Sequence, residues 1–446
     1  MEREADDPSP SIANWVVIEP EICRKDVASY CRHGVTSAKV HASNGQFLRV
    51  SFELSAPPSV SRLFLHCPEE REMGSFDTVV AAHDDAVLFR LEIDFEGLCP
   101  LALYAVDYFV YTAGAHPSGG PELSLLPRTY PTNDEFYAAP KDSWVRTSPW
   151  RMRDVQSIGL LRTGKRGFVV AELRPYPSIA DDEHDEPLAA TLFMLRSNGE
   201  SPKAAGEWEV KLLTARGGKA KRGDIRWWQT HKVVPFGTYL CWVDLYRGVI
   251  LCNVNHEKPD LQYVQLPAEG APHCSPDLYR TGFPQASRTV CIGNGNEMKF
   301  ISVIRSNGML SGASKPGSSF TITIWTLKQS YDVMEWVKDA AIGAHQLWAM
   351  EGYDRLLPRI APQFPLLSMD NPEIIHFVLR EKDTFDADTN MYLVTVNIVS
   401  KKVLSYEDIE ANISEESDDT AAYSLFCNEP FFPSEFPKYL KKPTSR

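Results

Sequence analysis

The feature that most constrains the fold of this chain is an alternation of apolar and polar residues with period two. In residues 47–54 every second residue, beginning with Leu48, is apolar, and the residues between these positions are polar. Because successive side chains of a β-strand point to opposite faces, the pattern predicts strands with one buried and one solvent-facing side. The alternation recurs at residues 87–93 and at residues 207–212, where Trp208, Val210 and Leu212 form the apolar set.

A second group of segments is apolar throughout and is predicted to form inner strands, at residues 168–173, 248–254 and 392–396. Turn residues that tolerate positive φ separate the strands, at 44–45, 164–167, 197–199, 294–295 and 306–308. Helical signals are scarce. The best candidate, residues 334–344, is equally compatible with a strand that runs into a loop, and the 32 prolines lie mostly between the apolar runs.

Many short strands with tight turns are typical of a sandwich, a barrel or a propeller, and 446 residues are too many for one sandwich. A propeller or two packed β domains remain, and an irregular repetition that places a Trp-led strand near Trp208 and near Trp336 hints at blades. We therefore expect an all-β, β-propeller-like array of short antiparallel sheets with few helices. The domain should span residues 15–440, between a flexible N-terminal segment (1–14) and a C-terminal tail (441–446).

The charge balance argues against nucleic-acid and membrane partners. Lys and Arg number 46 against 59 Asp and Glu, so the net charge of −13 offers no positive field to a phosphate backbone or an anionic bilayer. The basic cluster within residues 217–223 stands among glycines and is interpreted as a solvated turn. The acidic start, Met1–Pro8, lacks the apolar run of a signal peptide, and no stretch approaches the roughly 20 apolar residues of a membrane span. We expect a cytoplasmic or nuclear protein.

Nine cysteines are spread along the chain without any Cys-x-x-Cys pair. This distribution favours reduced, mostly buried thiols over disulfides or a zinc site. Cys241 and Cys252 flank an apolar segment and are candidate nucleophiles, but we interpret them as buried structural thiols.

Three segments come close to functional signatures and fail on the chemistry. Residues 159–166 have the spacing of a phosphate-binding loop, but Arg166 replaces the magnesium-binding hydroxyl residue and a strand-like segment follows. Residues 293–298 have two glycines of a dinucleotide fingerprint, and Met298 replaces the third. The acidic loop at 181–187 lacks the alternating ligands of a calcium loop. The sequence therefore predicts no catalytic, cofactor-binding or metal-binding residue, and no cofactor.

One resemblance to a known family rests on residues 242–254, which read Trp-Val-Asp-Leu-Tyr-Arg-Gly-Val-Ile-Leu-Cys-Asn-Val, and on Leu-Gln-Tyr-Val-Gln-Leu-Pro at 261–267. This hallmark, at 242–267, resembles that of a plant family catalogued as domain of unknown function 1618, in which Asp commonly stands at the position of Asn253. Shorter supporting segments lie at residues 43–54, 158–161, 168–173 and 433–440.

The resemblance implies no functional residue, because the family has no established activity or cofactor. Its rhythm of strands and turns looks like that of the propeller domains found behind F-boxes in plant proteins. No F-box is apparent in Met1–Glu21, so a role as substrate receptor of a ubiquitin ligase lacks its usual adaptor. Read physically, the hallmark is two inner strands joined by a turn, which an ion pair between Asp244 and Arg247 would lock. The alternative is an exposed Arg247 that recognises an acidic ligand.

The expected function is that of a non-catalytic β-scaffold that binds an unidentified protein or peptide through loops at one end of its sheets. An aromatic content of 11%, with ten tryptophans, supplies both core residues and binding anchors. Two alternatives stay open: a hydrolase with a site assembled from several loops, and a receptor that holds a small molecule or carbohydrate in a central cavity. The sequence leaves the partner, the blade number and the oligomeric state undetermined.

Overall fold

The alternating segments form strands that bury the predicted face. In β3 (Phe47–Glu53), Leu48, Val50 and Phe52 are buried, while the polar residues between them keep part of their surface exposed. The segments that are apolar throughout lie inside four-stranded sheets, where both faces of a strand pack against neighbouring parts of the fold.

The structure is a computed structural model, which describes residues 13–31, 34–67, 77–114, 120–141, 152, 154–176, 185–198, 207–215, 221–267, 282–293, 296–312, 315–330, 333–353, 355–380, 391–408 and 431–440. The expected N-terminal segment, apart from its last two residues, and the expected tail lie outside these ranges.

Four sheets of four strands follow one another along the chain, and within each sheet every strand pairs antiparallel with the next. We number them blades 3 to 6. Blade 3 contains β9 (Ile158–Thr163), β10 (Gly167–Pro175), β11 (Ala189–Ser197) and β12 (Glu209–Thr214); blade 4 contains β13 (Lys232–Phe236), β14 (Tyr239–Asp244), β15 (Gly248–Cys252) and β16 (Leu261–Gln265). Blade 5 contains β17 (Arg288–Gly293), β18 (Glu297–Arg305), β19 (Phe320–Ser330) and β20 (Val333–Gly343); blade 6 contains β21 (Gln363–Leu367), β22 (Ile374–Arg380), β23 (Met391–Asn397) and β24 (Lys402–Asp408).

The N-terminal strands form a larger sheet, whose strands are β1 (Val16–Lys25), β2 (Ala38–His41), β3, β4 (Val60–His66), β5 (Thr78–His83), β6 (Ala86–Ile93), β7 (Ala105–Thr112), β8 (Glu122–Leu125) and β25 (Phe432–Ser434). A single described residue pair, Glu21 with Thr78, joins β1 to β5. The sheet therefore divides into blade 1 (β1 to β4 with β25) and blade 2 (β5 to β8). β1 pairs with β4 in parallel, an exception to the antiparallel arrangement expected from the sequence.

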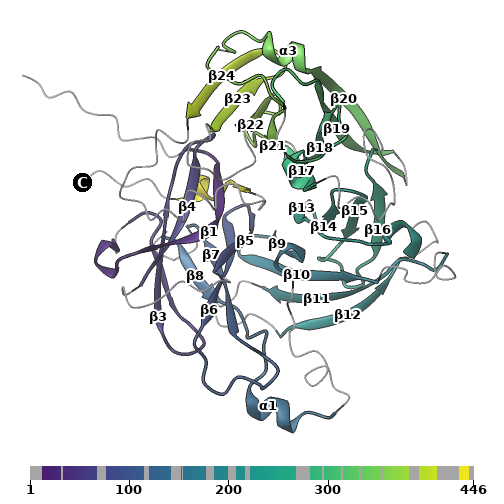
Figure 1. Cartoon of the computed structure of the whole chain (residues 1–446). Coiled ribbons are helices and arrows are strands. Elements are labelled where there is room, and N and C mark those ends of the chain that lie inside the picture. The colour runs from purple at the N-terminus through teal and green to yellow at the C-terminus, as the bar shows by residue number, and fades with distance from the viewer. Residues whose placement is uncertain are drawn as a thin grey trace, which may run out of the picture.

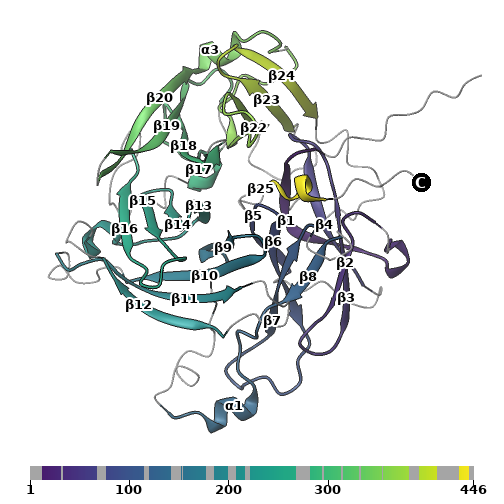
Figure 2. The ribbon, with the colours of Figure 1, turned by 180° about the vertical axis from the view of Figure 1, so that it is seen from behind.

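The blades stand in a ring, which Figures 1 and 2 show from opposite sides. The strands β5, β9, β13, β17 and β21 are innermost and contact one another in turn, and β25 contacts β5. β25 also pairs antiparallel with β1, Val16 opposite Ser434, so a C-terminal strand completes the blade that the N-terminal strands begin. The chain is thus an all-β, propeller-like ring.

The hydrophobic core lies between neighbouring blades. Leu240 and Trp242 of β14 pack with Ala190 of β11 between blades 3 and 4. Val249 of β15 packs with Phe300 of β18 between blades 4 and 5. Because each blade buries its two faces against different neighbours, its middle strands carry apolar residues on both sides.

The hallmark segment is the middle of blade 4. Val249 and Ile250 have no exposed surface and belong to the clusters on opposite faces of the blade. In the turn, Arg247 Nη1 donates to Asp244 Oδ2 at 3.1 Å, and the backbone N–H of Tyr246 donates to Asp244 Oδ1 at 2.8 Å. The predicted turn is confirmed. Arg247 is 6% exposed, so the alternative of an exposed arginine that recognises an acidic ligand is wrong.

The described residues include two short α-helices, α1 (Asn133–Ala138) and α3 (Ala344–Trp348). α1 begins with a capping box in which Thr132 and Glu135 exchange side-chain and backbone hydrogen bonds. Residues 334–344, ambiguous in the sequence, continue β20 as far as Gly343 before α3 begins. No helix in the described part of the chain is long and apolar enough to cross a membrane.

The predicted burial of residues 207–212 is wrong. Trp208 is buried, but Val210 and Leu212 are 55% and 73% exposed, and Leu213 packs in the core instead. β12 begins at Glu209 and is the outermost strand of blade 3. Whether a residue of this outermost strand is buried therefore depends on whether the neighbouring blade covers it. The period-two pattern of the sequence gives no information about that coverage.

Candidate ligand site in the central channel

A cavity of about 270 Å³ lies in the centre of the ring, where the innermost strands of blades 2, 4 and 5 approach β25. Much of its wall is apolar, with side chains such as Val233, Ile292 and Phe432. The polar and charged side chains that reach it are His83, Asp84, Lys232, Asn296, Ser434 and Glu435. Apolar walls with a few convergent polar groups are typical of ligand sites.

Lys232, the first residue of β13, borders this cavity and two smaller cavities of about 40 Å³ each. Its Nζ donates to Thr289 Oγ1 of β17 at 3.3 Å, and no described carboxylate forms an ion pair with it. Burial of the ammonium group lowers the pKa of Lys232. Holding an unpaired ammonium group inside a fold costs free energy, so Lys232 is a candidate functional residue.

Arg288, the first residue of β17, is a second buried cation in the same region. It borders one of the smaller cavities together with Lys232, Gln285 and Phe431. Arg288 is 3% exposed, its Nη1 donates to the carbonyl oxygen of Leu245 at 2.9 Å, and its Nε has no hydrogen-bond partner among the described residues. Burial lowers the pKa of Arg288 to about 10, so its guanidinium group stays charged at neutral pH.

Another part of the cavity wall is acidic. Asp84 lies in the β5–β6 turn, and Glu435, directly after β25, forms an ion pair with Lys438. His83 Nδ1 accepts a hydrogen bond from the backbone N–H of Arg162 at 2.9 Å, and its Nε2 lies 3.7 Å from Asp84 Oδ1. Burial lowers the pKa of His83, so the ring is neutral near pH 7.

His83 and Ser434 both border the cavity, but they do not contact each other as a base and a nucleophile would. The Nδ1 atom of His83 is occupied by a backbone N–H, and Ser434 Oγ accepts from the backbone N–H of Phe436 at 3.4 Å. Among the described residues, no hydrogen bond links His83 to Ser434. The wall therefore lacks the pair that nucleophilic hydrolysis requires.

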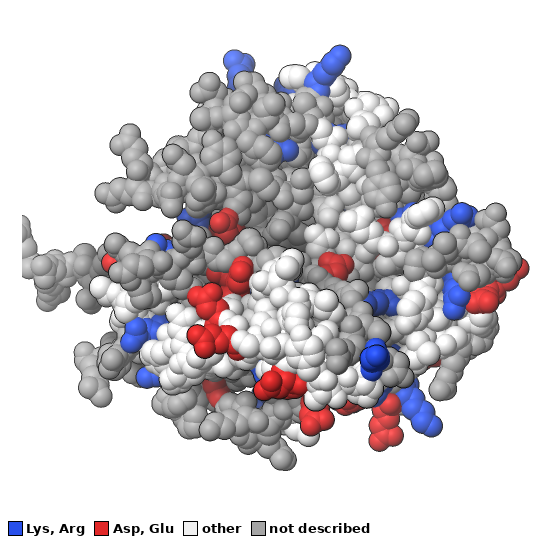
Figure 3. Space-filling model, turned by 60° about the horizontal axis from the view of Figure 1, so that its bottom comes forward, with Lys and Arg blue, Asp and Glu red and all other residues white. Residues whose placement is uncertain are grey.

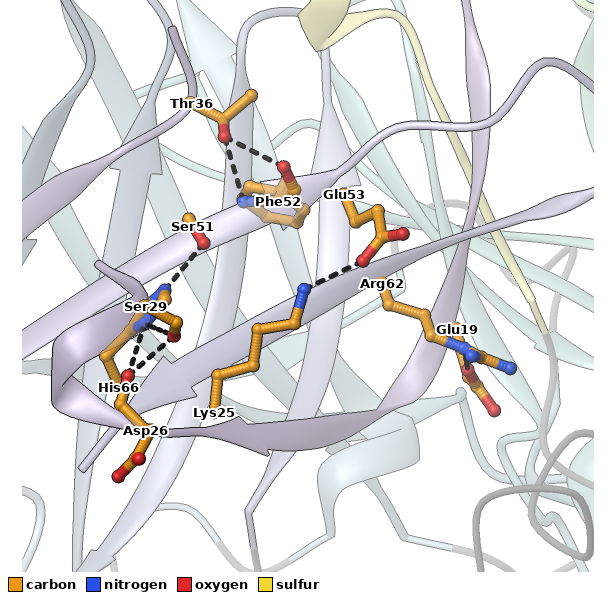
Figure 4. Close-up of polar contacts among 10 residues, drawn as sticks. All are labelled: Glu19, Lys25, Asp26, Ser29, Thr36, Ser51, Phe52, Glu53, Arg62 and His66. Carbon is orange, nitrogen blue, oxygen red and sulfur yellow. Dashed lines mark hydrogen bonds and ion pairs between the residues drawn. The ribbon is translucent and has the colours of Figure 1, made fainter. Parts of the chain in front are cut away.

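A serine and a histidine do meet in blade 1, away from the channel (Figure 4). Ser51 Oγ lies 2.7 Å from His66 Nε2, and His66 Nδ1 faces Ser29 Oγ at 3.1 Å and the carbonyl oxygen of Asp26 at 3.3 Å. Among the described residues no carboxylate forms a hydrogen bond with the ring, and none of the three cavities borders it. This contact is a hydrogen bond between β3 and β4, and the described residues do not extend it to the acid of a catalytic triad.

The candidate cysteine nucleophiles are buried in blade 4. Cys241 and Cys252 have no exposed surface. Burial raises the pKa of Cys252 to about 12 and that of Cys241 well above its ordinary value. Thiols held protonated in this way are poor nucleophiles, which agrees with their interpretation as structural residues.

The rejected motifs lie in turns. Residues 159–166 belong to the β9–β10 hairpin, with Gly164 at a φ of 61°. Gly293 pairs with Glu297 at the end of the β17–β18 hairpin, although residues 294–295 between them lie outside the described residues. Most of the acidic loop, residues 181–184, also lies outside them.

Sequence reasoning missed both cations of the channel. Lys232 and Arg288 each stand at the start of an apolar run, and this position was the available signal. A charge at that position is typical of an ordinary strand end. It becomes informative only when the strand is known to be the innermost one of its blade.

Comparison with known proteins gave structural matches at low sequence identity. A search of curated proteins found no match. Among solved structures, a mutant of the NanB sialidase from Streptococcus pneumoniae is similar at 8% identity with a TM-score of 0.31, over 74% of this chain and 60% of that one. An exo-beta-1,3-galactanase from Clostridium thermocellum is similar at 8% identity with a TM-score of 0.22, over 88% of this chain and 52% of that one. The chain therefore spans little more than half the length of either structure, and these values carry no argument about activity.

A family model described as a protein of unknown function (DUF1618) matches residues 242–376. The match begins at Trp242, the first residue of the hallmark, and ends at His376 in β22. It therefore covers most of blade 4, all of blade 5 and the beginning of blade 6. The resemblance found in the hallmark is confirmed: residues 242–376 of this chain carry the DUF1618 family segment.

Proposed function

We propose that this protein is a non-catalytic receptor that binds a small ligand in the central channel of its propeller-like ring. One observation carries the proposal. Lys232 is a half-buried lysine without a carboxylate partner among the described residues, and it borders three cavities beside the innermost strands of the ring. Strained or costly groups that a fold retains cluster at binding and catalytic sites.

The same geometry favours a receptor over a hydrolase. The channel wall has a lysine, a histidine and carboxylates; among the described residues His83 forms no hydrogen bond with a hydroxyl or thiol there, and the Thr289 hydroxyl accepts its hydrogen bond from Lys232. Cys291, the cysteine that borders the cavity, is buried, and its pKa is raised by that burial. Binding needs shape and charge, and both are present in the channel.

A cavity-filling variant tests the proposal. A panel of small neutral, anionic and cationic molecules is screened against the full chain by ligand-observed NMR. Ala82→Phe places a ring in the cavity wall and should abolish binding of the molecules found. Ala138→Phe, on the exposed surface of α1, is the matched control and should leave their binding unchanged. A screen without any binder, or binders that Ala82→Phe does not affect, would contradict the proposal.

A second candidate function, binding of a protein or peptide through loops, is favoured by exposed apolar residues around α1. Leu103 is 90% exposed and Leu101 is 52% exposed, both in the β6–β7 connection. The bridge between Leu98 and Thr132 ties this connection to the start of α1, which carries the exposed Tyr137. In Figure 3, which brings this end of the molecule forward, acidic side chains lie beside uncharged surface. A partner segment with both apolar and basic residues fits such a surface.

Site-specific crosslinking tests this second candidate. A photoreactive residue at position 103 should capture a defined partner from cells of the source organism, and the same residue at position 212, another exposed leucine, should not. Equal capture from both positions would mean that exposure alone explains it, and the candidate would be wrong.

A further inference from the structure

We propose that the ligand of the channel is a monocarboxylate with an apolar body, whose carboxylate binds between Lys232 and Arg288. The inference rests on the proposed function and names the ligand class of the same site.

The two cations define the carboxylate position. Both border the smaller cavity next to β21, and neither forms an ion pair with a carboxylate among the described residues. Arg288 Nε is buried without a hydrogen-bond partner among the described residues. Buried polar groups are almost always paired in a folded protein. An unpaired N–H donor of Arg288 and an ammonium group without an ion-pair partner among the described residues border one cavity, and a ligand that accepts hydrogen bonds and carries negative charge would satisfy both.

The sizes of the cavities separate the two parts of the ligand. The smaller cavity, about 40 Å³, has room for a group of a few water-sized atoms, which suits a carboxylate. Lys232 also borders the larger cavity of about 270 Å³. The wall of that cavity carries apolar side chains that would cover a hydrocarbon body, among them Ala81, Val233, Ile292, Met369 and Phe432.

The acidic part of the larger cavity sets the charge that the ligand tolerates. Asp84 and Glu435 border it, and of these two only Glu435 forms an ion pair with Lys438, which Lys438 shares with Asp370. A doubly charged anion such as phosphate would be repelled there and would leave its second charge poorly solvated. A single carboxylate at the end of an apolar body keeps its charge beside the two cations.

Matched ligands test the inference on the full chain by isothermal titration calorimetry at pH 7. The probes are hexanoate, its neutral analogue hexanamide, and inorganic phosphate. Hexanoate should bind at least about tenfold more tightly than hexanamide, because two charged donors face the carboxylate. Phosphate should bind more weakly than hexanoate.

Two variants of the lysine locate the interaction. Lys232→Met should remove the preference for the acid over the amide while leaving hexanamide binding in place, and Lys232→Arg should restore part of the preference. Lys299→Met, at a lysine of β18 that borders none of the three cavities, should leave the preference unchanged. A preference that survives in Lys232→Met, or tighter binding of phosphate, overturns the inference.

The outcomes also separate this inference from the proposed function. If the NMR panel yields channel ligands that Ala82→Phe displaces, but hexanamide binds as tightly as hexanoate, the receptor stands and the carboxylate assignment is wrong. If neither the panel nor the matched ligands bind, both are wrong.

Discussion

Two lysines in neighbouring blades show how differently one type of side chain is held in this fold. Lys299 Nζ lies 3.1 Å from Asp339 Oδ2 and 3.2 Å from Glu297 Oε2. Partial burial opposes its charge, but the hydrogen bonds to these carboxylates outweigh that effect and raise the pKa of Lys299. Lys232 has one hydroxyl as its hydrogen-bond partner, and burial lowers its pKa. The first lysine stabilises its surroundings, whereas the second destabilises the fold that contains it.

Replacing each lysine by methionine should therefore change stability in opposite directions. Lys232→Met should raise the free energy of unfolding, on the order of 1 kcal/mol, because an apolar side chain replaces a half-buried charge that has no ion-pair partner among the described residues. Lys299→Met should lower it, because Asp339 loses its lysine partner and Glu297 keeps only Lys328. Urea unfolding at pH 7 measures both. If Lys232→Met is as destabilising as Lys299→Met, Lys232 is a structural residue and its candidacy for a binding site fails.

His376 makes stability depend on pH. It is 8% exposed, its Nδ1 bonds to Thr395 Oγ1 at 2.9 Å, and its Nε2 has no partner among the described residues. Burial lowers the pKa of His376 from 6.5 to about 4. Between these values the unfolded chain binds a proton that the folded chain does not, so stability falls as the pH falls through this window. The loss should reach roughly 3 kcal/mol by pH 4.

His376→Phe should flatten that slope, since phenylalanine takes up no proton. Glu19 acts in the opposite direction, because burial raises its pKa to about 7 despite the ion pair with Arg62 that Figure 4 shows. The informative quantity is therefore the difference between variant and wild type in urea unfolding at pH 7, 5.5 and 4.5. A difference that is the same at all three pH values would contradict the assignment to His376.

At the scale of elements, the hallmark hairpin should tolerate very little change. Val249→Asp or Ile250→Asp would place a carboxylate in a cluster with no exposed surface, at a cost of several kcal/mol. Arg247→Ala would leave the fully buried Asp244 without its guanidinium partner and should cost about 3 kcal/mol. A turn at the surface would lose only about 1 kcal/mol. Thermal melting of the three variants beside wild type ranks these costs, and a Val249→Asp or Ile250→Asp variant that melts like wild type would contradict the buried assignment.

Strands whose burial depends on nearby sequence were predicted correctly, whereas burial that depends on distant parts of the fold was not. β3 and β15 could be predicted because their patterns and flanking turns lie within a dozen residues of sequence. The wrong prediction, the buried face of β12, depended on which neighbour covers Val210 and Leu212. Likewise, residues 334–344 were ambiguous because a short apolar run fits a strand and a helix equally well.

At the scale of the whole molecule, the closure of the ring should control its stability. β25 pairs with β1, and Phe436, directly after it, is fully buried in the core between blades 1 and 2. A chain that ends after residue 430 should therefore unfold at a much lower temperature than the full chain, with loss of cooperativity. A chain that ends after residue 440 keeps both features and should melt like the full chain. Calorimetry compares the three, and equal melting of the shortest chain would show that β25 does not hold the ring closed.

The candidate site also belongs to this scale, which is why the sequence did not predict it. Lys232 comes from blade 4, Arg288 from blade 5 and Phe431 from the segment before β25. No motif joins them, since they meet only when the ring is complete. The sequence predicted the propeller-like array of sheets. It did not predict the channel, which forms where the innermost strands of several blades come together.

The pairing of β25 with β1 also has a consequence for biosynthesis. A ribosome makes Val16 long before Ser434, so the edge of β1 that accepts β25 must wait until the residues between these two strands have been translated. During that time the growing polypeptide presents an open strand edge of the kind that recruits chaperones or other nascent chains. The last blade to become complete is the one whose synthesis began first.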